Sequence, residues 1–276
     1  MSGRLYVVGT PIGNLSDASP RMKEVLSEVD FIAAEDTRVT LKLLNHFGIK
    51  KPMISYFEHN LKEKGIEIVS RIEKGENCAV VSDAGMPCIS DPGEDLVRLC
   101  AERGIETIVV PGPSALIAAL CVSGLLTGRF CFEGFLSVNQ SSRKKHLEDL
   151  KTEERTMIFY EAPHKLKKTI SDFHKAFGDD RKIAIVREIT KIHETVLRLT
   201  LKEAEIYYEE NEPRGEYVLV LEGNIAPKEE LTLTDAINIA KKYLDNGEKA
   251  TEAAKKAAKE SGFSKSEIYN GLRELN

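Results

Sequence analysis

The chain has 276 residues, of which 42% are hydrophobic and 30% charged, and its formal net charge is −5 at pH 7. A chain of this length can bury a sizeable core and suggests about two domains. The negative net charge excludes a polycation that attracts nucleic acid through its overall field, so a nucleic acid would have to be held by local basic patches.

Cysteine usage and hydropathy narrow the class of protein further. The five cysteines are an odd number and form no CxxC pair, which argues against a disulfide framework or a zinc site, so we expect reduced thiols and no metal. The most apolar stretch, residues 115–126, is shorter than the roughly 20 residues of a membrane-spanning helix. The first ten residues lack the basic segment and apolar run of a secretory signal. We therefore expect a cytoplasmic protein with no membrane partner.

The first 125 residues alternate apolar strands with helices. The expected strands span residues 4–9, 30–36, 52–57, 77–85 and 106–114. The expected helices span residues 20–29, 40–47, 60–75 and 92–103, followed by an apolar helix that Ser114 caps. Repeated strand–helix units predict a parallel sheet with right-handed crossovers, in which ligands bind beyond the carboxyl ends of the strands.

The pattern changes after residue 125, because strands then follow one another with fewer helices between them. The expected strands span residues 129–136, 155–163, 181–191, 193–200 and 216–223, and the expected helices span residues 142–151, 165–177 and 203–208. This order predicts a second, mixed sheet. We therefore place an N-terminal α/β domain at residues 1–125 and a second α/β domain at residues 126–224.

The last part of the chain differs again. Residues 223–230 look like a linker, and residues 231–276 are expected to form a small helical domain with eight Lys/Arg and seven Asp/Glu. We expect two helices, then a glycine turn and then a third helix, and this order is typical of a helix-turn-helix. A small bundle that packs on the main body explains the same periodicity, and periodicity alone favours the bundle.

Glycine, proline and small residues cluster directly after three of the predicted strands, in the loops 9–14, 82–93 and 111–115. Glycine permits positive φ and close approach of the backbone to a ligand, although glycine and proline are also common turn residues. Three such loops at one edge of a sheet favour a ligand site. They contain no GxxxxGKS/T or GxGxxG motif and no Lys or Arg, so the ligand should present hydroxyls, an amide edge, an aromatic ring or a cation rather than a polyphosphate.

Seven motifs occur in order between residues 9 and 223: "GTPIGNL", "AEDTR", "SDAGMPCISDPG", "VVPGPSA", "FEGFL", "YEAPHKL" and "PRGEYVLVLEG". Together they resemble the tetrapyrrole-methylase superfamily. The "EDTR", "DAGMP" and "EAPH" elements resemble more closely its branch of type I small-subunit ribosomal RNA methyltransferases than the porphyrin-modifying branch. Lys165, after "EAPH", stands where the family more often has Arg, which keeps the charge but loses bidentate geometry.

The resemblance implies two α/β domains with S-adenosylmethionine (SAM) in the cleft between them, and a homodimer. It also implies methyl transfer to the ribose 2′-hydroxyl of cytidine 1402 in the 16S rRNA of the 30S subunit, and a tail of the helix-turn-helix type. SAM carries its own reactive methyl group, so the protein mainly supplies binding and orientation. Alignment is worth roughly 7–11 kcal/mol and a general base about 3–5 kcal/mol, so alignment should dominate.

Two other functions stay open at this point. A SAM-dependent methyltransferase that acts on a tetrapyrrole explains the same loops but not the helical tail. A ligand-sensing regulator that binds DNA through the tail is a third interpretation, against which the near-neutral tail and the net charge of −5 argue.

The loops and the resemblance together give candidate residues for SAM binding. The candidates in the loops are Pro11, Gly13, Asp83, Ala84, Gly85, Met86, Ser114 and Ala115. Tyr160, Glu161 and Gly215 are added by analogy with the cleft of the superfamily, although Tyr160 could simply belong to the core. Asp83 could accept hydrogen bonds from a ligand or cap its own turn through an Asx bond, and the two are equally favoured.

Charged residues give the candidates for the RNA side of the site. Those for orienting or deprotonating the ribose hydroxyl are Glu35, Asp36 and Glu133, and an ion pair is an equal alternative for each. Those for RNA binding are Arg38, His59, Lys165, Arg187 and Lys191. Residues 143–146 and 164–168 are further basic runs, and a solvated helix face is the favoured interpretation of Lys167 and Lys168.

Overall fold

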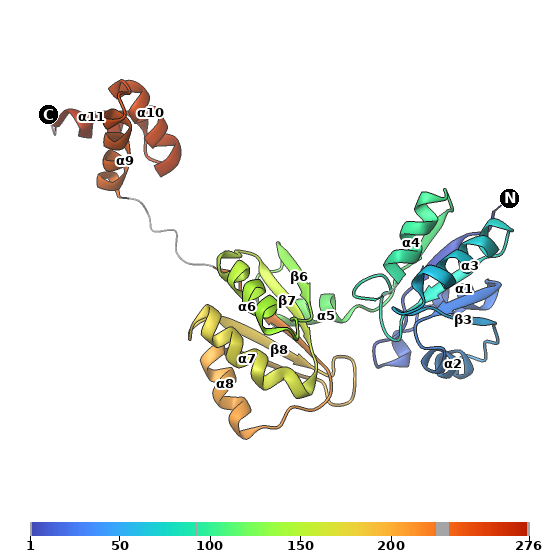
Figure 1. Ribbon diagram of the computed structural model, residues 1–276. Coiled ribbons are helices and arrows are strands. Elements are labelled where there is room, and N and C mark those ends of the chain that lie inside the picture. Colours follow the sequence, from blue (N-terminus) through green and yellow to red (C-terminus); the bar gives the residue numbers. More distant parts are fainter. Residues whose placement is uncertain (1, 92, 225–231, 275–276) are drawn as a thin grey trace. The chain divides into compact units, whose positions relative to one another are not determined.

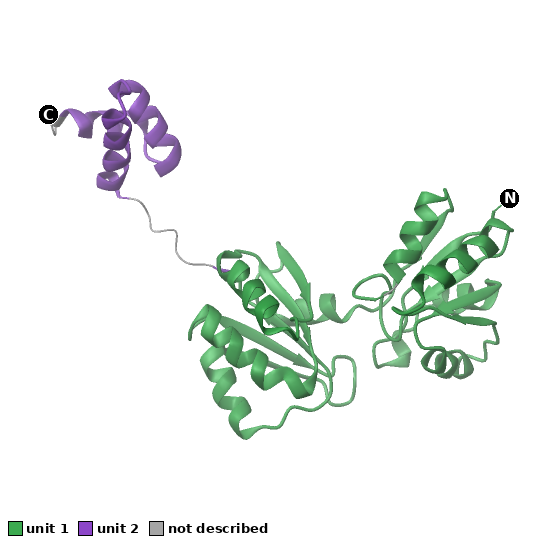
Figure 2. Cartoon of the chain, in the orientation of Figure 1, with its two compact units in different colours: residues 1–223 green, residues 224–276 purple. Residues whose placement is uncertain are grey.

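The computed structural model describes residues 2–91, 93–224 and 232–274. The chain forms two compact units, residues 1–223 and residues 224–276 (Figure 2). The expected helix start at position 92 and most of the expected linker lie outside the described residues.

The first unit contains two five-stranded sheets, and the first of these is parallel throughout. Its strands are β1 (Leu5–Val8), β2 (Phe31–Ala34), β3 (Met53–Ser55), β4 (Cys78–Val81) and β5 (Thr107–Val110), in the order β3-β2-β4-β1-β5. Its helices are α1 (Pro20–Glu28), α2 (Thr37–His46), α3 (Leu61–Glu73) and α4 (Gly93–Glu102), with a 3-10 turn at Leu15–Asp17. The predicted parallel sheet is confirmed.

Helices cover both faces of this sheet (Figure 1). Side chains alternate along each strand, so neighbouring residues bury opposite faces. Phe31 and the side chains of the other strands that point to the same face of the sheet pack against α3 and α4. Ile32 and the side chains that point to the opposite face pack against α1 and α2. The nearly continuous apolar strands of the sequence follow from this double coverage.

Two helix starts show how local side chains set the boundaries. Ser19 accepts a hydrogen bond from the backbone N–H of Met22 at 3.0 Å, and Pro20 is the first residue of α1, as predicted. Helix α2 begins at Thr37, three residues earlier than expected, because the Asp36 carboxylate accepts a hydrogen bond from the backbone N–H of Arg38 at 2.8 Å. The "EDTR" motif therefore contains a helix cap.

The second sheet is mixed, as predicted. Its strands are β6 (Phe130–Gly134), β7 (Thr156–Glu161), β8 (Lys182–Arg187), β9 (Thr195–Thr200) and β10 (Tyr217–Leu221), in the order β6-β7-β10-β8-β9. Strands β6 and β7 are parallel, and the other neighbours are antiparallel. The helices of this region are α5 (Ala115–Ser123), α6 (Gln140–Asp149), α7 (Pro163–Phe177) and α8 (Leu201–Glu210), with a 3-10 turn at Leu150–Thr152.

The apolar helix α5 packs on the second sheet. Its buried residues Leu116, Ala119 and Leu120 lie in one core with residues of β7, β8 and β10. Helices α6, α7 and α8 bury the opposite face of the same sheet. The helix that ends the expected first domain therefore has its packing partner in the second sheet, and the boundary at residue 125 stays a prediction.

The second unit is a group of three helices, α9 (Leu233–Asp245), α10 (Ala250–Ser261) and α11 (Lys265–Glu274). Thr232 and Asp235 form a reciprocal capping box at the start of α9. Alanines of α9 and α10 and the larger Ile268 and Leu272 of α11 form the core. The predicted helical tail is confirmed. Within the described residues of both units, no helix has the length and apolarity needed to cross a membrane.

The packing of α5 on the second sheet can be tested by truncating Leu120, which is 4% exposed. Leu120→Ala should lower the free energy of unfolding by about 2–5 kcal/mol, because it leaves a cavity in that core. Urea denaturation measures the change. The control is Leu126→Ala, because Leu126 is 70% exposed and should change stability little. Equal effects of the two substitutions would contradict this packing.

Candidate active site

A cavity of about 470 Å³ is lined by the loop after β4, the start of α5, the carboxyl ends of β7 and β8, and the start of β10. Eight of the predicted SAM residues line it: Asp83, Ala84, Gly85, Met86, Ser114, Ala115, Tyr160 and Glu161. Pro11 and Gly13 line an adjoining cavity of about 360 Å³, which shares Asp83 and Ala84 with the first. Gly215 lines neither cavity but precedes Glu216, which lines both.

The three glycine-containing loops contact one another directly. Thr10 and Gly85 exchange two hydrogen bonds, from Thr10 N to Gly85 O at 2.9 Å and from Gly85 N to Thr10 O at 3.2 Å. A Cβ atom at Gly9 would lie 2.7 Å from the Cα of Gly112 and 2.6 Å from the sulfur of Met86. The N–H of Gly112 donates a hydrogen bond to that sulfur at 3.2 Å. The loops thus form one connected layer, which requires glycine at positions 9 and 112.

Glu35 and Asp83 are two carboxylates in the wall of the larger cavity, at the ends of the neighbouring strands β2 and β4. The backbone N–H of Asp83 donates to Glu35 Oε2 at 3.4 Å, and the backbone N–H of Asp36 donates to Asp83 Oδ1 at 3.0 Å. Burial, together with the charge of Asp83, raises the pKa of Glu35. Burial also raises the pKa of Asp83. The carboxylate of Asp83 thus accepts a hydrogen bond across the two loops.

Asp36 has the opposite environment to its neighbour Glu35. Its carboxylate caps α2 and pairs with the guanidinium of Arg38, with Nη2 to Oδ2 at 2.5 Å. These hydrogen bonds from Arg38 lower the pKa of Asp36 to about 2. Asp36 does not line the larger cavity. The side chain of Arg38 is 86% exposed, so the guanidinium remains open to solvent while it holds Asp36.

Lys191, in the loop after β8, lies in the wall shared by both cavities. Its Nζ pairs with Glu188 at 2.9 Å and with Glu216 at 2.8 Å. Burial opposes the charged form, but these two hydrogen bonds raise the pKa of Lys191 overall. A Cβ atom at Gly13 would lie 2.5 Å from Cγ of Lys191, so the glycine leaves room for the lysine methylenes. Two carboxylates thus already compensate the charge of this predicted RNA-binding residue.

Backbone strain is concentrated in two loops of the site. Among the described residues, the non-glycine residues with positive φ are Cys88, Ser90, Glu188 and Thr190, with φ between 51° and 72°. The first pair lies in the loop after β4 and the second pair in the loop after β8. Such conformations cost free energy and persist where the surrounding structure holds them, often at functional sites. This signal was not accessible from the sequence, because none of the four residues is glycine.

Tyr160 and Glu161 form the wall contributed by β7. The ring of Tyr160 packs edge-on against Phe132, with centroids 4.9 Å apart, and burial raises its pKa. Glu161 is 5% exposed and accepts hydrogen bonds from the backbone N–H of Ala162 at 2.9 Å and from the hydroxyl of Thr169. A buried carboxylate requires such partners. Glu161 is therefore fixed in the cavity wall.

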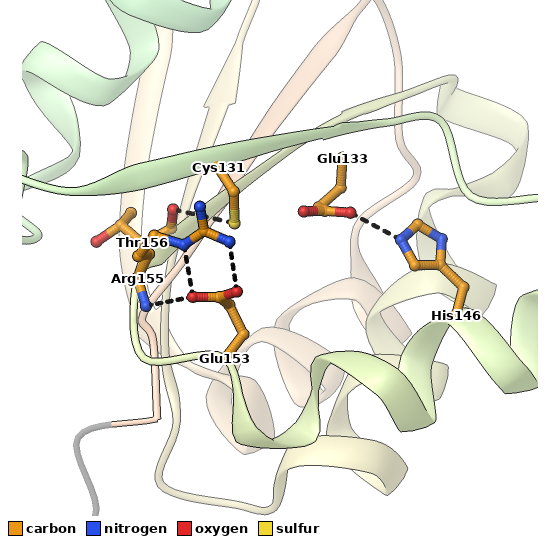
Figure 3. A network of polar contacts seen from close by, with 6 residues as sticks. All are labelled: Cys131, Glu133, His146, Glu153, Arg155 and Thr156. Carbon is orange, nitrogen blue, oxygen red and sulfur yellow. Dashed lines mark hydrogen bonds and ion pairs between the residues drawn. The ribbon is translucent and has the colours of Figure 1, made fainter.

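The remaining candidates lie outside the larger cavity. Figure 3 shows Glu133 and His146 pointing toward one another, with Oε2 and Nε2 2.9 Å apart. Arg187 donates to the carbonyl of Arg214 at 2.7 Å, and His59 is exposed beside the ring of Phe57. Lys165 is half-buried in the first turn of α7. The described part of the chain contains no group of three or more His, Cys, Asp or Glu that could hold a metal.

The comparisons with known proteins agree with this architecture. The sequence model of the family Tetrapyrrole (Corrin/Porphyrin) Methylases matches residues 4–205. The crystal structure of the methyltransferase CobJ has a TM-score of 0.61 at 18% identity, over 81% of this chain and 95% of that chain. Uroporphyrin-III C-methyl transferase from Thermus thermophilus, complexed with S-adenyl homocysteine, has a TM-score of 0.57 at 18% identity, over 80% of this chain and 97% of that chain. The two sheets and their cavity define a methyltransferase of the tetrapyrrole-methylase class.

A nearer relative specifies the family. The ribosomal RNA small subunit methyltransferase I of Synechocystis sp. is 46% identical over 99% of this chain and 98% of its own length. The chain belongs to the ribosomal RNA small subunit methyltransferase I family, and SAM is its cofactor.

The contact between Gly9 and Gly112 generates a prediction for cofactor binding. Gly9→Ala should lower the free energy of unfolding by about 1–3 kcal/mol and weaken SAM binding, because the added methyl group forces the loops apart. Calorimetric titration with SAM measures the affinity. The control is Gly128→Ala, since a Cβ atom at that exposed position meets nothing within 4 Å. Unchanged SAM affinity in Gly9→Ala would show that the cofactor does not depend on this layer.

The two neighbouring acids should respond to neutralisation with opposite signs. Glu35→Gln should raise the free energy of unfolding at pH 7, because a carboxylate with a raised pKa destabilises the fold when it is charged. The difference between variant and wild type should vanish when the pH falls below 4.5, the usual pKa of a glutamate side chain. Asp36→Asn should lower the free energy of unfolding at pH 7, because the stabilising charge is lost. That difference should remain down to pH 3.8 and should disappear as the pH falls from 3.8 to about 2.

Urea denaturation of both variants at pH 7 and pH 4 separates these two effects. Asn caps helices nearly as well as Asp, so Asp36→Asn isolates the charge from the cap. A change of the same sign in both variants at pH 7 would contradict the environments described for the two carboxylates.

Proposed function

We propose that this chain transfers a methyl group from SAM to the ribose 2′-oxygen of cytidine 1402 in the 16S rRNA of the small ribosomal subunit. The observation that carries the proposal is the pair Glu35 and Asp83, held by hydrogen bonds at the cavity wall of a member of the rRNA small subunit methyltransferase I family. We further propose that the protein is a homodimer and acts in the cytoplasm.

The chemistry of the cavity fits SAM. Its wall carries the carboxylates of Glu35, Asp83, Asp91, Glu161 and Glu216. Among the described residues, Lys191 is the one basic side chain that lines it, and two carboxylates pair with that lysine. An acidic wall suits a sulfonium cation and would repel a polyphosphate. Apolar residues of the same wall offer contacts to an adenine ring.

The proton of the acceptor hydroxyl would be received by one of the carboxylates with a raised pKa, Glu35 or Asp83. SAM supplies an activated methyl group when bound, so the protein has to orient the acceptor hydroxyl and receive its proton. A base works best when its pKa lies near the operating pH, which favours Glu35 and Asp83 over Asp36, whose pKa is about 2. Glu133 pairs with His146 outside the cavity, so the proposed mechanism gives it no part.

Arg38 is the best placed of the predicted RNA-binding residues. It lies two residues after Asp36, in the first turn of α2, and its exposed guanidinium can contact a phosphate while Asp36 orients it. Lys191 serves instead as part of the wall that both cavities share, because its side chain is only 28% exposed and two carboxylates hold its Nζ. The backbone of the RNA would accordingly approach the site from the side of α2.

Labelled SAM and 30S subunits that lack the modification test the proposal directly. The wild-type protein should place label in 16S rRNA, and mass spectrometry should locate the methyl group on the ribose of cytidine 1402. Label at another nucleotide would correct the position. Absence of label from 16S rRNA with a folded protein, or methylation of uroporphyrinogen instead, would overturn the proposed substrate. Sedimentation equilibrium of the full chain measures the oligomeric state.

Asp83→Ala should weaken SAM binding by roughly tenfold or more while changing the free energy of unfolding little, because a partly exposed carboxylate in the cavity wall is removed. Calorimetry measures the affinity, and urea denaturation measures the stability. The matched control is Asp17→Ala, an exposed carboxylate that lines neither cavity. Unchanged affinity in Asp83→Ala would remove Asp83 from the site.

A further inference from the structure

The two basic runs of the sequence meet in one groove. A hollow of about 730 Å³ lies between α6 and α7, which are labelled on the second sheet in Figure 1. Residues from both runs line it, namely Arg143 and Lys144 from the first and Lys168 from the second. Lys151 and Lys175 add two further basic side chains, and Glu148 and Asp172 are its carboxylates. We call this hollow the α6–α7 groove.

The carboxylates of the α6–α7 groove are already paired. Arg143 is 6% exposed and donates from Nε to Asp172 at 2.6 Å, and from a second guanidinium nitrogen to the hydroxyl of Thr169 at 2.8 Å. Lys151 pairs with Glu148 at 2.8 Å. Lys144, Lys168 and Lys175 are exposed and, within the described part of the chain, have no ion-pair partner. Among the residues that the structure describes, the rim thus carries three lysines without an ion-pair partner above a floor of paired charges, and the carboxylate of Glu205 lies within electrostatic range of Lys175.

This arrangement reverses the sign of the charge locally in a chain whose net charge is −5. Like charges gathered on one rim repel one another, and a polyanion relieves that repulsion while it releases counterions. Lys168 and Lys175 are seven residues apart on one face of α7, which is roughly 10 Å along the helix axis. A chain of phosphates can meet both lysines along this length, whereas one small anion meets a single lysine.

Helix α7 contributes residues both to the α6–α7 groove and to the cavity of the candidate active site, although none of the described residues lines both. Pro163, the first residue of α7, lines that cavity, and Lys168 follows five residues later, roughly 8 Å along the axis. A chain of hydrogen bonds leads from Arg143 in the groove floor through Thr169 to Glu161 in the cavity wall. The first turns of α7 thus separate the cavity from the lysines of the groove, and an RNA strand whose target nucleotide lies at the cavity can span this short distance.

We propose that the α6–α7 groove binds the phosphate backbone of the RNA substrate beside the target nucleotide, through Lys144, Lys168 and Lys175. This inference rests on the proposed function, because it takes rRNA as the substrate. Lysines act on phosphate as point charges, so they add affinity and orientation without reading the sequence of bases.

The double variant Lys168→Ala and Lys175→Ala tests the groove, since alanine preserves an exposed helix. In filter binding with transcribed 16S rRNA, the dissociation constant should rise about three- to tenfold, and the slope of log K against log salt should become shallower by about 1 for each phosphate that the variant no longer neutralises. SAM affinity should stay unchanged. The matched control is Lys50→Ala with Lys74→Ala, two exposed lysines outside the groove. Lys168→Arg with Lys175→Arg should retain RNA binding.

Unchanged RNA affinity and salt slope in the double alanine variant would overturn the proposal. Weakened binding only to assembled 30S particles, with unchanged binding to free rRNA, would also overturn it, because a ribosomal protein would then occupy the groove. If the wild-type protein leaves rRNA unmethylated, the proposed function fails. The binding comparison still decides on the groove in that case.

Discussion

The close approach of Gly9 and Gly112 is the contact on which the candidate active site depends. Strand β1 is flanked by β4 and β5, so the loops that leave these three strands emerge side by side. They can touch because neither glycine carries a side chain, and Met86 from the third loop fills the space beside them. The hydrogen bonds between Thr10 and Gly85 extend the pairing beyond the strands. The position of Asp83 and the shape of the wall follow from this layer.

Much of the fold was predictable because it depends on short-range patterns. Apolar runs such as Cys78–Val81 mark strands covered on both faces, and the spacing of helices separates the parallel sheet from the mixed one. The three loops were found for the same reason, since glycine and proline follow the strands directly. A parallel sheet followed by a mixed one, and the loops after the strands, could therefore be predicted without knowledge of contacts between distant residues.

The less predictable features depend on residues that are far apart in the sequence. Glu35 and Asp36 are neighbours, yet burial and then the charge of Asp83 raise the pKa of Glu35, whereas hydrogen bonds from Arg38 lower the pKa of Asp36. The methylenes of Lys191 occupy the space above Gly13, and no local sequence motif indicates this contact. The basic residues around Lys144 and Lys168 look like separate solvated faces until α6 and α7 are placed together. The candidate roles of single residues therefore stay predictions, although most of the cofactor candidates line one cavity.

The packing of α5 has a consequence for how the chain could be divided. Ser114 and Ala115, at its start, line the cavity with the loops of the first sheet, whereas its buried face belongs to the core of the second sheet. A fragment that ends at residue 125 would carry this helix with its apolar face uncovered, and such a surface promotes aggregation. A break before Ser114 would leave α5 with the sheet that covers it. The first fragment would then lack part of the cavity wall, so the cofactor site can be complete only in a chain that contains both sheets.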